Sequence, residues 1–281
     1  MALAAVAWST AGILQRELHV GLATQVTGRA MFAFAALAIF VAVTQRHGLV
    51  DDIRGSGWAM LGVSVSTAIA SASFIVALNY TTVARVLFLQ AAAPMIAALL
   101  AWVMLGEPVS VRSWAAMLIA LAGVGVMVGA PGRGGILVDL LTIVIPFAFA
   151  ISLVITRRHR HISMAPATCL AQVLIFVCAV PFADPGSVDA RNLVLLILLG
   201  AGQIGLGLAL LSVGARLLPA AEIATITLLE VVLGPLWVWI FVSERPSPAI
   251  LIGGAIVVVG VLLQASGEPA TDVAEVSPPP P

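Results

Sequence analysis

The sequence contains very little charge. Only 9% of its 281 residues are charged, against about 25% in soluble domains, whereas 61% are hydrophobic and the mean hydropathy is +1.14. This balance excludes a soluble globular domain and indicates an integral membrane protein that contacts lipid. We expect no nucleic-acid partner.

Cysteine and histidine are also scarce. Cys169 and Cys178 lie nine residues apart on one expected helix, hence on opposite faces at about 100° per residue, which predicts neither a disulfide nor a metal site. All four histidines fall in loops or at helix ends, at His19, His47, His159 and His161. A membrane enzyme would need a metal or nucleophile cluster at one depth, so we expect no enzyme and no cofactor.

The hydrophobic residues form long continuous runs, unlike the alternating segments of about ten residues in a barrel, so the spans are helices. A helix needs about 20 residues to cross the hydrocarbon. Ten such stretches occur, at 1–15, 23–44, 57–78, 83–105, 112–129, 136–156, 164–183, 192–213, 220–242 and 249–266. The expected fold class is an all-α membrane protein with ten transmembrane helices, followed by a disordered tail, 267–281.

Two parts of the chain repeat each other. Residues 84–126 and 221–263 superimpose without a gap at an offset of 137, with Trp102/Trp239, Glu107/Glu244 and Gly123/Gly260 among the identities. Five expected helices separate matching residues, and because five is odd, matching helices cross in opposite directions. The sequence thus predicts two inverted five-helix repeats, 1–130 and 131–266. Transporters built this way hold the substrate at the junction and alternate access by rocking one half.

Every basic residue is an arginine, and their distribution predicts the orientation. With a cytoplasmic N-terminus, seven arginines fall in inner loops and four or five lie outside, which favours cytoplasmic N- and C-termini in the cell (inner) membrane. The cluster Arg157-Arg158-His159-Arg160-His161 is interpreted as the topology determinant, with anionic-lipid contact as a second role.

The matched segments resemble a known family. The run from Ala93-Pro94 to Gly106-Glu107, and the run from Glu230 through Gly234-Pro235 to Ser243-Glu244, are similar to the duplicated EamA pattern of the drug/metabolite transporter superfamily. Ala7-Trp8-Ser9-Thr10 resembles the first helix of YddG-type amino-acid exporters. This resemblance implies export of small metabolites, with amino acids as the best substrate. The first half departs from the pattern with Ala93 where the second has Glu230.

Glu230 is interpreted as the only acidic residue deep in a span. A carboxylate there costs several kcal/mol unless it faces a cavity or a partner. It is the first candidate for recognition of a substrate ammonium group or for proton coupling. The alternative is a protonated side chain that holds helices together by a hydrogen bond.

Pro94 and Pro235 are expected to interrupt the fourth and ninth helices and to free a backbone carbonyl in each. In repeat register Gln90 corresponds to Thr227, so each half offers a polar side chain one turn before the Ala93 or Glu230 position. Such kinks suit a midplane cavity, although proline kinks also serve packing alone.

Two arginines lie within the expected spanning helices. Arg29, about six residues into the second, either pairs with Glu230 or a substrate carboxylate, or extends to the interface. Arg85, near the end of the fourth, is expected to extend to the interface. Gln203 and Gln172 are mid-helix amides, whose alternative role is hydrogen bonding between helices.

The remaining candidates are aromatic residues and a false motif. Trp8, Tyr80 and the neighbouring Asn79 are expected to line the cavity, and interface anchoring is the alternative for Tyr80. The run Gly200–Gly205 matches the dinucleotide fingerprint literally, but it lies inside a span, where Ala201, Gly205 and Ala209 instead favour close helix packing. Glu107 and Glu244 are interpreted as turn-fixing residues before the N-caps Ser110 and Ser247.

The expected substrate-binding set is Trp8, Arg29, Asn79, Tyr80, Gln90, Gln203, Thr227 and Glu230. The sequence predicts a secondary transporter that exports small metabolites, with protons as a candidate coupling ion and a monomer or homodimer as open alternatives. Nucleotide sugars, lipid-linked sugars and facilitated drug or metabolite permeation are the alternatives. An anionic sugar would need several basic groups in the cavity, and only Arg29 is well placed.

Overall fold

In the computed structural model the described residues are 2–44, 57–106, 110–128, 135–159, 164–207, 210 and 220–265, and they are nearly all helical. In chain order the elements are α1 (Ala2–Ser9), α2 (Ala11–Arg16), α3 (Leu22–Thr44), α5 (Gly57–Tyr80), α6 (Val83–Gln90), α7 (Ala93–Leu105), α8 (Val111–Val128), α9 (Gly135–Arg158), α10 (Ala165–Ala179), η1 (Val180–Phe182), η2 (Pro185–Ser187), α11 (Ala190–Ile197), η3 (Leu198–Leu206), α13 (Ala220–Val242) and α14 (Pro248–Ala265). Among them, η3 is a π-helix. Some expected spans consist of two consecutive helical elements. A turn separates α1 from α2 and α6 from α7, whereas α10 continues into η1 and α11 continues into η3.

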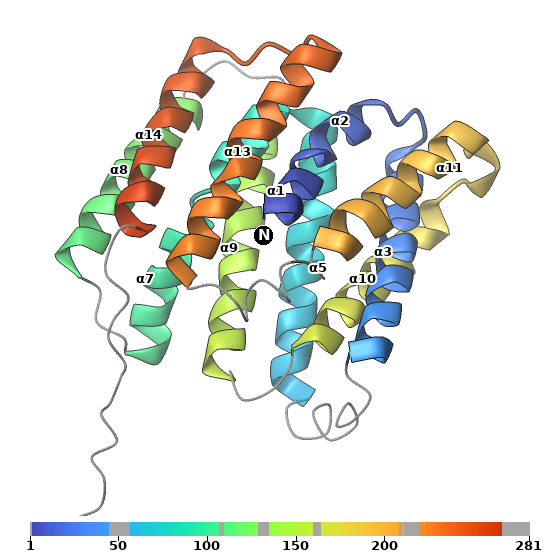
Figure 1. Cartoon of the computed structure of the whole chain (residues 1–281), viewed down its shortest axis with the longest axis horizontal. Helices are drawn as coiled ribbons and strands as arrows, with labels where there is room; N and C mark the ends of the chain where they lie inside the picture. Colours follow the sequence, from blue (N-terminus) through green and yellow to red (C-terminus); the bar gives the residue numbers. More distant parts are fainter. Residues whose placement is uncertain are drawn as a thin grey trace, which may run out of the picture.

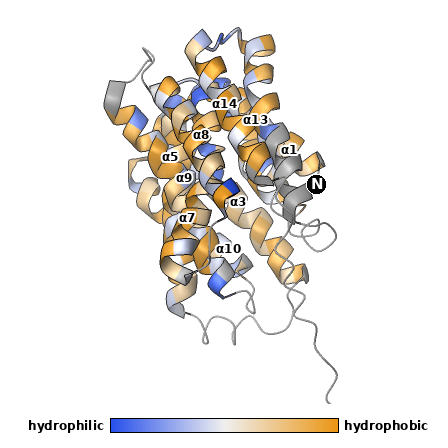
Figure 2. Cartoon of the chain, turned by 90° about the vertical axis from the view of Figure 1, so that its left-hand side faces the viewer, coloured by the Kyte–Doolittle hydropathy of each residue, from blue (hydrophilic) through white to orange (hydrophobic). Residues whose placement is uncertain are grey.

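The outer surface of the bundle is hydrophobic. Four segments are long and apolar enough to cross a membrane, namely Leu22–Val43, Gly57–Tyr80, Val83–Met104 and Leu137–Thr156, and shorter apolar helices accompany them. Large hydrophobic side chains point outward along the helices, and Leu118 and Leu121 are 64% and 67% exposed. Figure 2 shows hydrophobic residues over most of the helical surface. Hydrocarbon is the solvent such a surface requires, so this is a multi-pass membrane protein.

Helix packing follows a two-fold pattern. The corresponding helices α8 and α14 pack on each other, as do α3 and α10, while α1 packs on α13 just as α9 packs on α7. In Figure 1, α8 and α14 lie at one side, α3 and α10 at the other, and α1, α5, α9 and α13 between them. The expected fold class, an all-α membrane protein of two inverted five-helix repeats, is confirmed.

Glycines bring α8 and α14 into close contact. A Cβ atom added at Gly123 would lie 2.6 Å from the carbonyl oxygen of Gly253, and one at Gly260 would lie 2.9 Å from that of Ala116. At the 137-residue offset, Gly123 corresponds to Gly260 and Ala116 to Gly253, so each contact is the copy of the other. This self-complementary pairing is what a two-fold axis between the halves requires.

The turns after α7 and α13 repeat the same backbone conformation. Gly106, with φ +70°, and Ser243, with φ +58°, are both left-handed and are exactly one offset apart. Ser110 and Ser247 then each accept a hydrogen bond from the amide three residues on, at 3.1 and 3.4 Å. The predicted N-caps are therefore confirmed.

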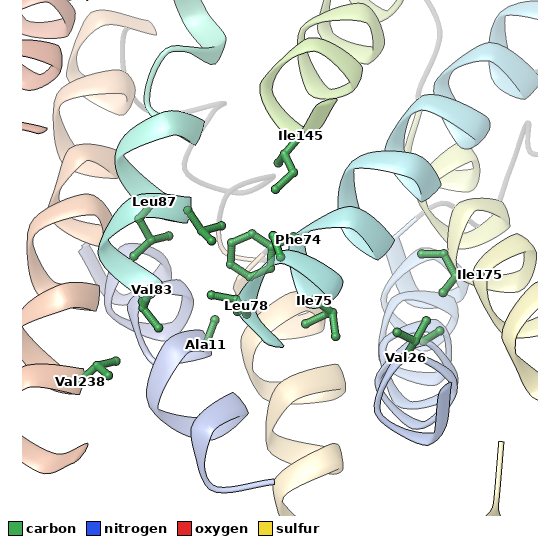
Figure 3. Close-up of a cluster of buried hydrophobic side chains, with 13 residues drawn as sticks. Ala11, Val26, Phe74, Ile75, Leu78, Val83, Leu87, Ile145, Ile175 and Val238 are labelled. Carbon is green, nitrogen blue, oxygen red and sulfur yellow. The ribbon is translucent and has the colours of Figure 1, made fainter. Parts of the chain in front are cut away.

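A buried hydrophobic cluster joins the two halves. Phe74 and Leu78 of α5 pack with residues of α6 and α13, and with Ile145 of α9 and Ile175 of α10. In Figure 3 they lie between Leu87 on one side and Ile175 on the other. Because Phe74 also contacts a buried arginine, this cluster borders the polar residues described next.

Candidate functional site

Arg29 is buried inside the bundle, with 5% of its surface exposed. Its Nη1 donates a hydrogen bond to Ser71 Oγ of α5 at 3.0 Å, and its Nη2 donates to Gln203 Oε1 of η3 at 3.1 Å. Its guanidinium carbon lies 5.9 Å from the centre of the Phe74 ring. The structure therefore brings Arg29 and Gln203 together across the junction of the repeats. The alternative in which Arg29 extends to the interface is wrong.

The charge of Arg29 has no counter-charge among the described side chains. The ion pairs found there are Arg16–Glu244, Arg85–Asp139 and Arg191–Glu17. The Nε atom of Arg29 is buried without a hydrogen-bond partner. An uncompensated charge in a protein interior costs several kcal/mol. The other alternative, pairing of Arg29 with Glu230, is not found in this structure.

Gln203 lies in the π-helical segment η3, which continues directly from α11. π-Helical turns are rare and are frequent at functional sites. Gly200 and Gly205 both face α3, where an added Cβ would lie 2.6 Å from Arg29 O and 2.5 Å from Ala36 Cβ. Close packing of the glycine-rich run is therefore confirmed.

The set expected to pack closely was Ala201, Gly205 and Ala209. Gly205 packs on α3 as predicted, and Gly200, five residues earlier in the π-helix, makes a second close contact with the same helix. Ala209 lies outside the described residues.

Trp8 of α1 packs against the same crossing. Its indole ring occupies the space that a Cβ at Gly207 would need, so only glycine fits there. Next to it, Trp237 Nε1 of α13 donates to Ser9 Oγ at 3.0 Å. Trp8 is half-buried, and Gly207, which it contacts, lies four residues after Gln203 in the sequence.

The two predicted proline interruptions have different outcomes. The fourth crossing is broken as expected, because α6 ends at Gln90 and α7 begins at Ala93, next to Pro94. The helix α13 runs unbroken across Pro235, so the interruption expected there is wrong. The inverted halves thus differ at mid-membrane in backbone as well as in sequence.

Among the described residues, neither Gln90 nor Glu230 forms a hydrogen bond or an ion pair with Arg29. Gln90 and Glu230 are half-buried, on α6 and α13. Thr227 belongs to α13, but its side chain lies outside the described part of the structure. Their assignment to the substrate site stays a prediction.

A pocket of about 600 Å³ opens where α2 meets the α5–α6 and α13–α14 turns, and the predicted residues Asn79 and Tyr80 line it. Asn79 Nδ2 donates to Gln25 Oε1 at 2.9 Å, and Gln15 Nε2 donates to the same oxygen. Gln25 precedes Arg29 by one turn on α3, so the two share a helix face. Polar side chains therefore continue from this pocket to Arg29.

Sequence reasoning missed Gln15, Gln25 and Ser71. Gln25 and Arg29 are spaced i, i+4 within a span, and that spacing could have revealed a polar face on this helix. Ser71 carried no such signal, because serine is common in spanning helices.

Glu244 connects three elements beside the pocket. Its Oε2 accepts from Arg16 Nε at 2.7 Å, and its Oε1 accepts from the backbone N–H of Val83, the first residue of α6, at 2.8 Å. Arg16 also donates to the carbonyl oxygens of Leu78 and Thr81. Glu244 does bond an exposed amide as predicted, but that amide begins a helix of the other repeat. Glu107, its counterpart, lies outside the described residues.

Arg85 is the second buried arginine, with 1% of its surface exposed. Its Nη2 lies 2.9 Å from Asp139 of α9 and donates a hydrogen bond to that carboxylate. The expectation that Arg85 extends to the interface is therefore wrong. Sequence reasoning did not consider Asp139, which is buried near the start of the segment Leu137–Thr156.

A bundle of two inverted repeats, with polar side chains at their junction, is an architecture common among membrane transporters. The model of the EamA-like transporter family matches residues 1–129 and again 136–265, so the chain belongs to this family. It is a membrane transporter of small molecules, and the family's members are transporters rather than enzymes.

A solved structure titled "Crystal structure of protein" has the same fold. It is 19% identical, with a TM-score of 0.62 over 93% of each chain. At this identity the likeness concerns the fold alone. No curated protein matches the sequence.

Proposed function

We propose that this transporter exports amino acids or closely related small metabolites across the cell (inner) membrane, by alternating access between units 1–130 and 131–266. The observation that carries the proposal is the Arg29–Gln203 contact, because it places a polar group of each repeat at their junction. The resemblance of Ala7–Thr10 to YddG-type exporters supports the amino-acid substrate. The excess of arginines in the expected inner loops supports cytoplasmic termini.

The proposed substrate cavity is lined by Trp8, Arg29, Asn79, Tyr80, Gln90, Gln203, Thr227 and Glu230. Asn79 and Tyr80 lie at the end of the bundle where the pocket opens, which we call the pocket end. In the proposed orientation this end faces the outside, so the substrate leaves there. The Glu244 contacts hold that end together, so they must open once per transport cycle.

Counterflow in proteoliposomes tests this function. Proteoliposomes that contain the purified full chain are loaded with one unlabelled amino acid at a time. Accumulation of the same amino acid in labelled form is then measured. Saturable accumulation of at least one amino acid is the expected result. If no amino acid accumulates and a nucleotide sugar does, the amino-acid proposal is wrong.

Proton coupling through Glu230 is tested separately. Glu230→Gln keeps the shape of the side chain but cannot exchange a proton, so flux should lose its dependence on pH. Glu17→Gln is the matched control, since it makes the same change at an exposed carboxylate and leaves Glu230 intact. An unchanged pH profile in Glu230→Gln would rule out the coupling.

A further inference from the structure

The neutral groups around Arg29 do not use its full hydrogen-bonding capacity. A guanidinium has five N–H donors and a permanent positive charge. Ser71 and Gln203 accept from its two terminal nitrogens, and Nε–H has no acceptor among the described residues. An acceptor that carries negative charge is therefore missing from the described surroundings of this side chain.

The position of Arg29 fits a transport site. It is the eighth residue of α3, which places it about 10 Å along the helix from the pocket end. The hydrocarbon is about 30 Å thick, so this depth is between the membrane surface and the midplane. Asn79 and Gln25 extend a polar face from the pocket toward it. Arg29 does not itself line the pocket, so in the proposed transport cycle a small anion reaches the guanidinium when this end of the bundle opens.

The helix that carries Gln203 departs from regular geometry at the same place. Gln203 belongs to the π-helical segment Leu198–Leu206, and its side-chain Oε1 accepts a hydrogen bond from Arg29 Nη2. Gln203 thus holds the guanidinium from the second repeat, while Ser71 holds it from the first. The two contacts fix the direction in which the planar group presents its remaining donors.

We propose that Arg29, held by Ser71 and Gln203, binds the carboxylate group of the transported substrate. The inference rests on the proposed function and adds the chemical class of the ligand and the residue that recognises it. A carboxylate matches one guanidinium in charge and in planar geometry. A phosphate or a nucleotide carries more charge than this single cation balances.

Binding and transport are measured separately on the purified full chain. Thermal unfolding is followed with L-phenylalanine, L-leucine and L-alanine, with their carboxamides, and with 3-phenylpropionate, which has a carboxylate and no ammonium group. The carboxylates should stabilise the wild type and the amides should not. Arg29→Gln should weaken carboxylate binding by roughly tenfold or more, since a charge-assisted pair is lost.

Gln203→Glu provides a sharper variant, because it adds a carboxylate at the position that already contacts Arg29. This variant should unfold at a higher temperature without ligand and should no longer respond to carboxylates. Gln172→Glu is the matched control, since Gln172 is also buried, on α10, and forms no hydrogen bond with an arginine among the described residues. It should unfold at a lower temperature than the wild type.

The outcomes separate the two proposals. If the amides bind as tightly as the acids, or Arg29→Gln binds carboxylates normally, the carboxylate site is wrong even where counterflow succeeds. If no carboxylate stabilises the wild type, the site is also wrong. If carboxylates bind through Arg29 but none accumulates in proteoliposomes, the site stands and the transport of these compounds is refuted.

Discussion

Arg29 and Arg85 are both buried in the helix bundle, yet their charges are balanced differently. Arg85 pairs with the Asp139 carboxylate at 2.9 Å. Among the described residues Arg29 has only neutral acceptors, the hydroxyl and carbonyl oxygens of Ser71 and the side-chain amide of Gln203. Separating a buried ion pair leaves a charge uncompensated, so the Arg85–Asp139 pair stabilises the fold. In the proposal above, a ligand supplies the negative charge that Arg29 lacks there.

Removing the counter-charge of Arg85 should have the largest effect. Asp139→Ala leaves a buried guanidinium without its carboxylate, and we expect the free energy of unfolding to fall by about 3–5 kcal/mol. Glu17→Ala is the control, because the Arg191–Glu17 pair is exposed and its loss should cost about 0–1 kcal/mol. Chemical unfolding in one detergent measures both. Equal losses would show that the Arg85 pair does not hold the fold together.

A close contact between uncharged backbones gives a scale for the ionic contacts. Gly123→Ala forces a methyl group against the Gly253 carbonyl, and overpacking of this kind should cost about 1–3 kcal/mol. Gly125→Ala on the same helix is the matched control, because no atom lies within 4 Å of its added Cβ. The same unfolding measurement compares the two variants. A Gly123→Ala variant as stable as Gly125→Ala would contradict the close α8–α14 contact.

The Glu244 contacts are expected to have an intermediate effect. Glu244→Gln weakens the bonds to Arg16 and Val83, and these half-buried, charge-assisted bonds should contribute about 1–2 kcal/mol. The pocket end should therefore open more often. Faster maleimide labelling of Ser247→Cys, with Cys169 and Cys178 replaced, would report this opening. Unchanged labelling would show that Glu244 does not hold this end closed.

Replacing Arg29 should change stability least. Arg29→Met removes an unbalanced charge together with its hydrogen bonds to the neutral acceptors of Ser71 and Gln203, so the free energy of unfolding should change by about 1 kcal/mol or less. Arg85→Met, the matched substitution, strands Asp139 and should be several kcal/mol less stable. Unfolding of the two variants side by side tests the contrast directly. Equal destabilisation would show that Arg29 is also a structural residue.

Much of the fold was predictable because it depends on local composition and counting. The apolar runs give the spans, and the five spans between Gly123 and Gly260 give the inversion. The turns were also predictable, since Gly106 matches Ser243 in register and Ser110 matches Ser247. The unbroken α13 was not, because a proline in a helix is compatible with either a break or continuity, and the surrounding packing selects one.

The candidate site was predictable only in part. Arg29 and Gln203 were identified as polar residues deep in spans, and the structure joins them. Asp139 was missed because it lies near the start of its span, where acidic residues usually reach water. The role of Glu244 at Val83 was missed because the two residues are 161 positions apart.

The sequence by itself determined that this chain is a membrane protein of two inverted repeats, because hydrophobicity and the parity of the repeat offset are properties of the chain. Only the tertiary structure decided which buried arginine is balanced. Along the sequence Arg29 and Arg85 have similar apolar neighbours. The carboxylate that neutralises one of them comes from a helix 54 residues away, and its absence from the other is a fact of packing.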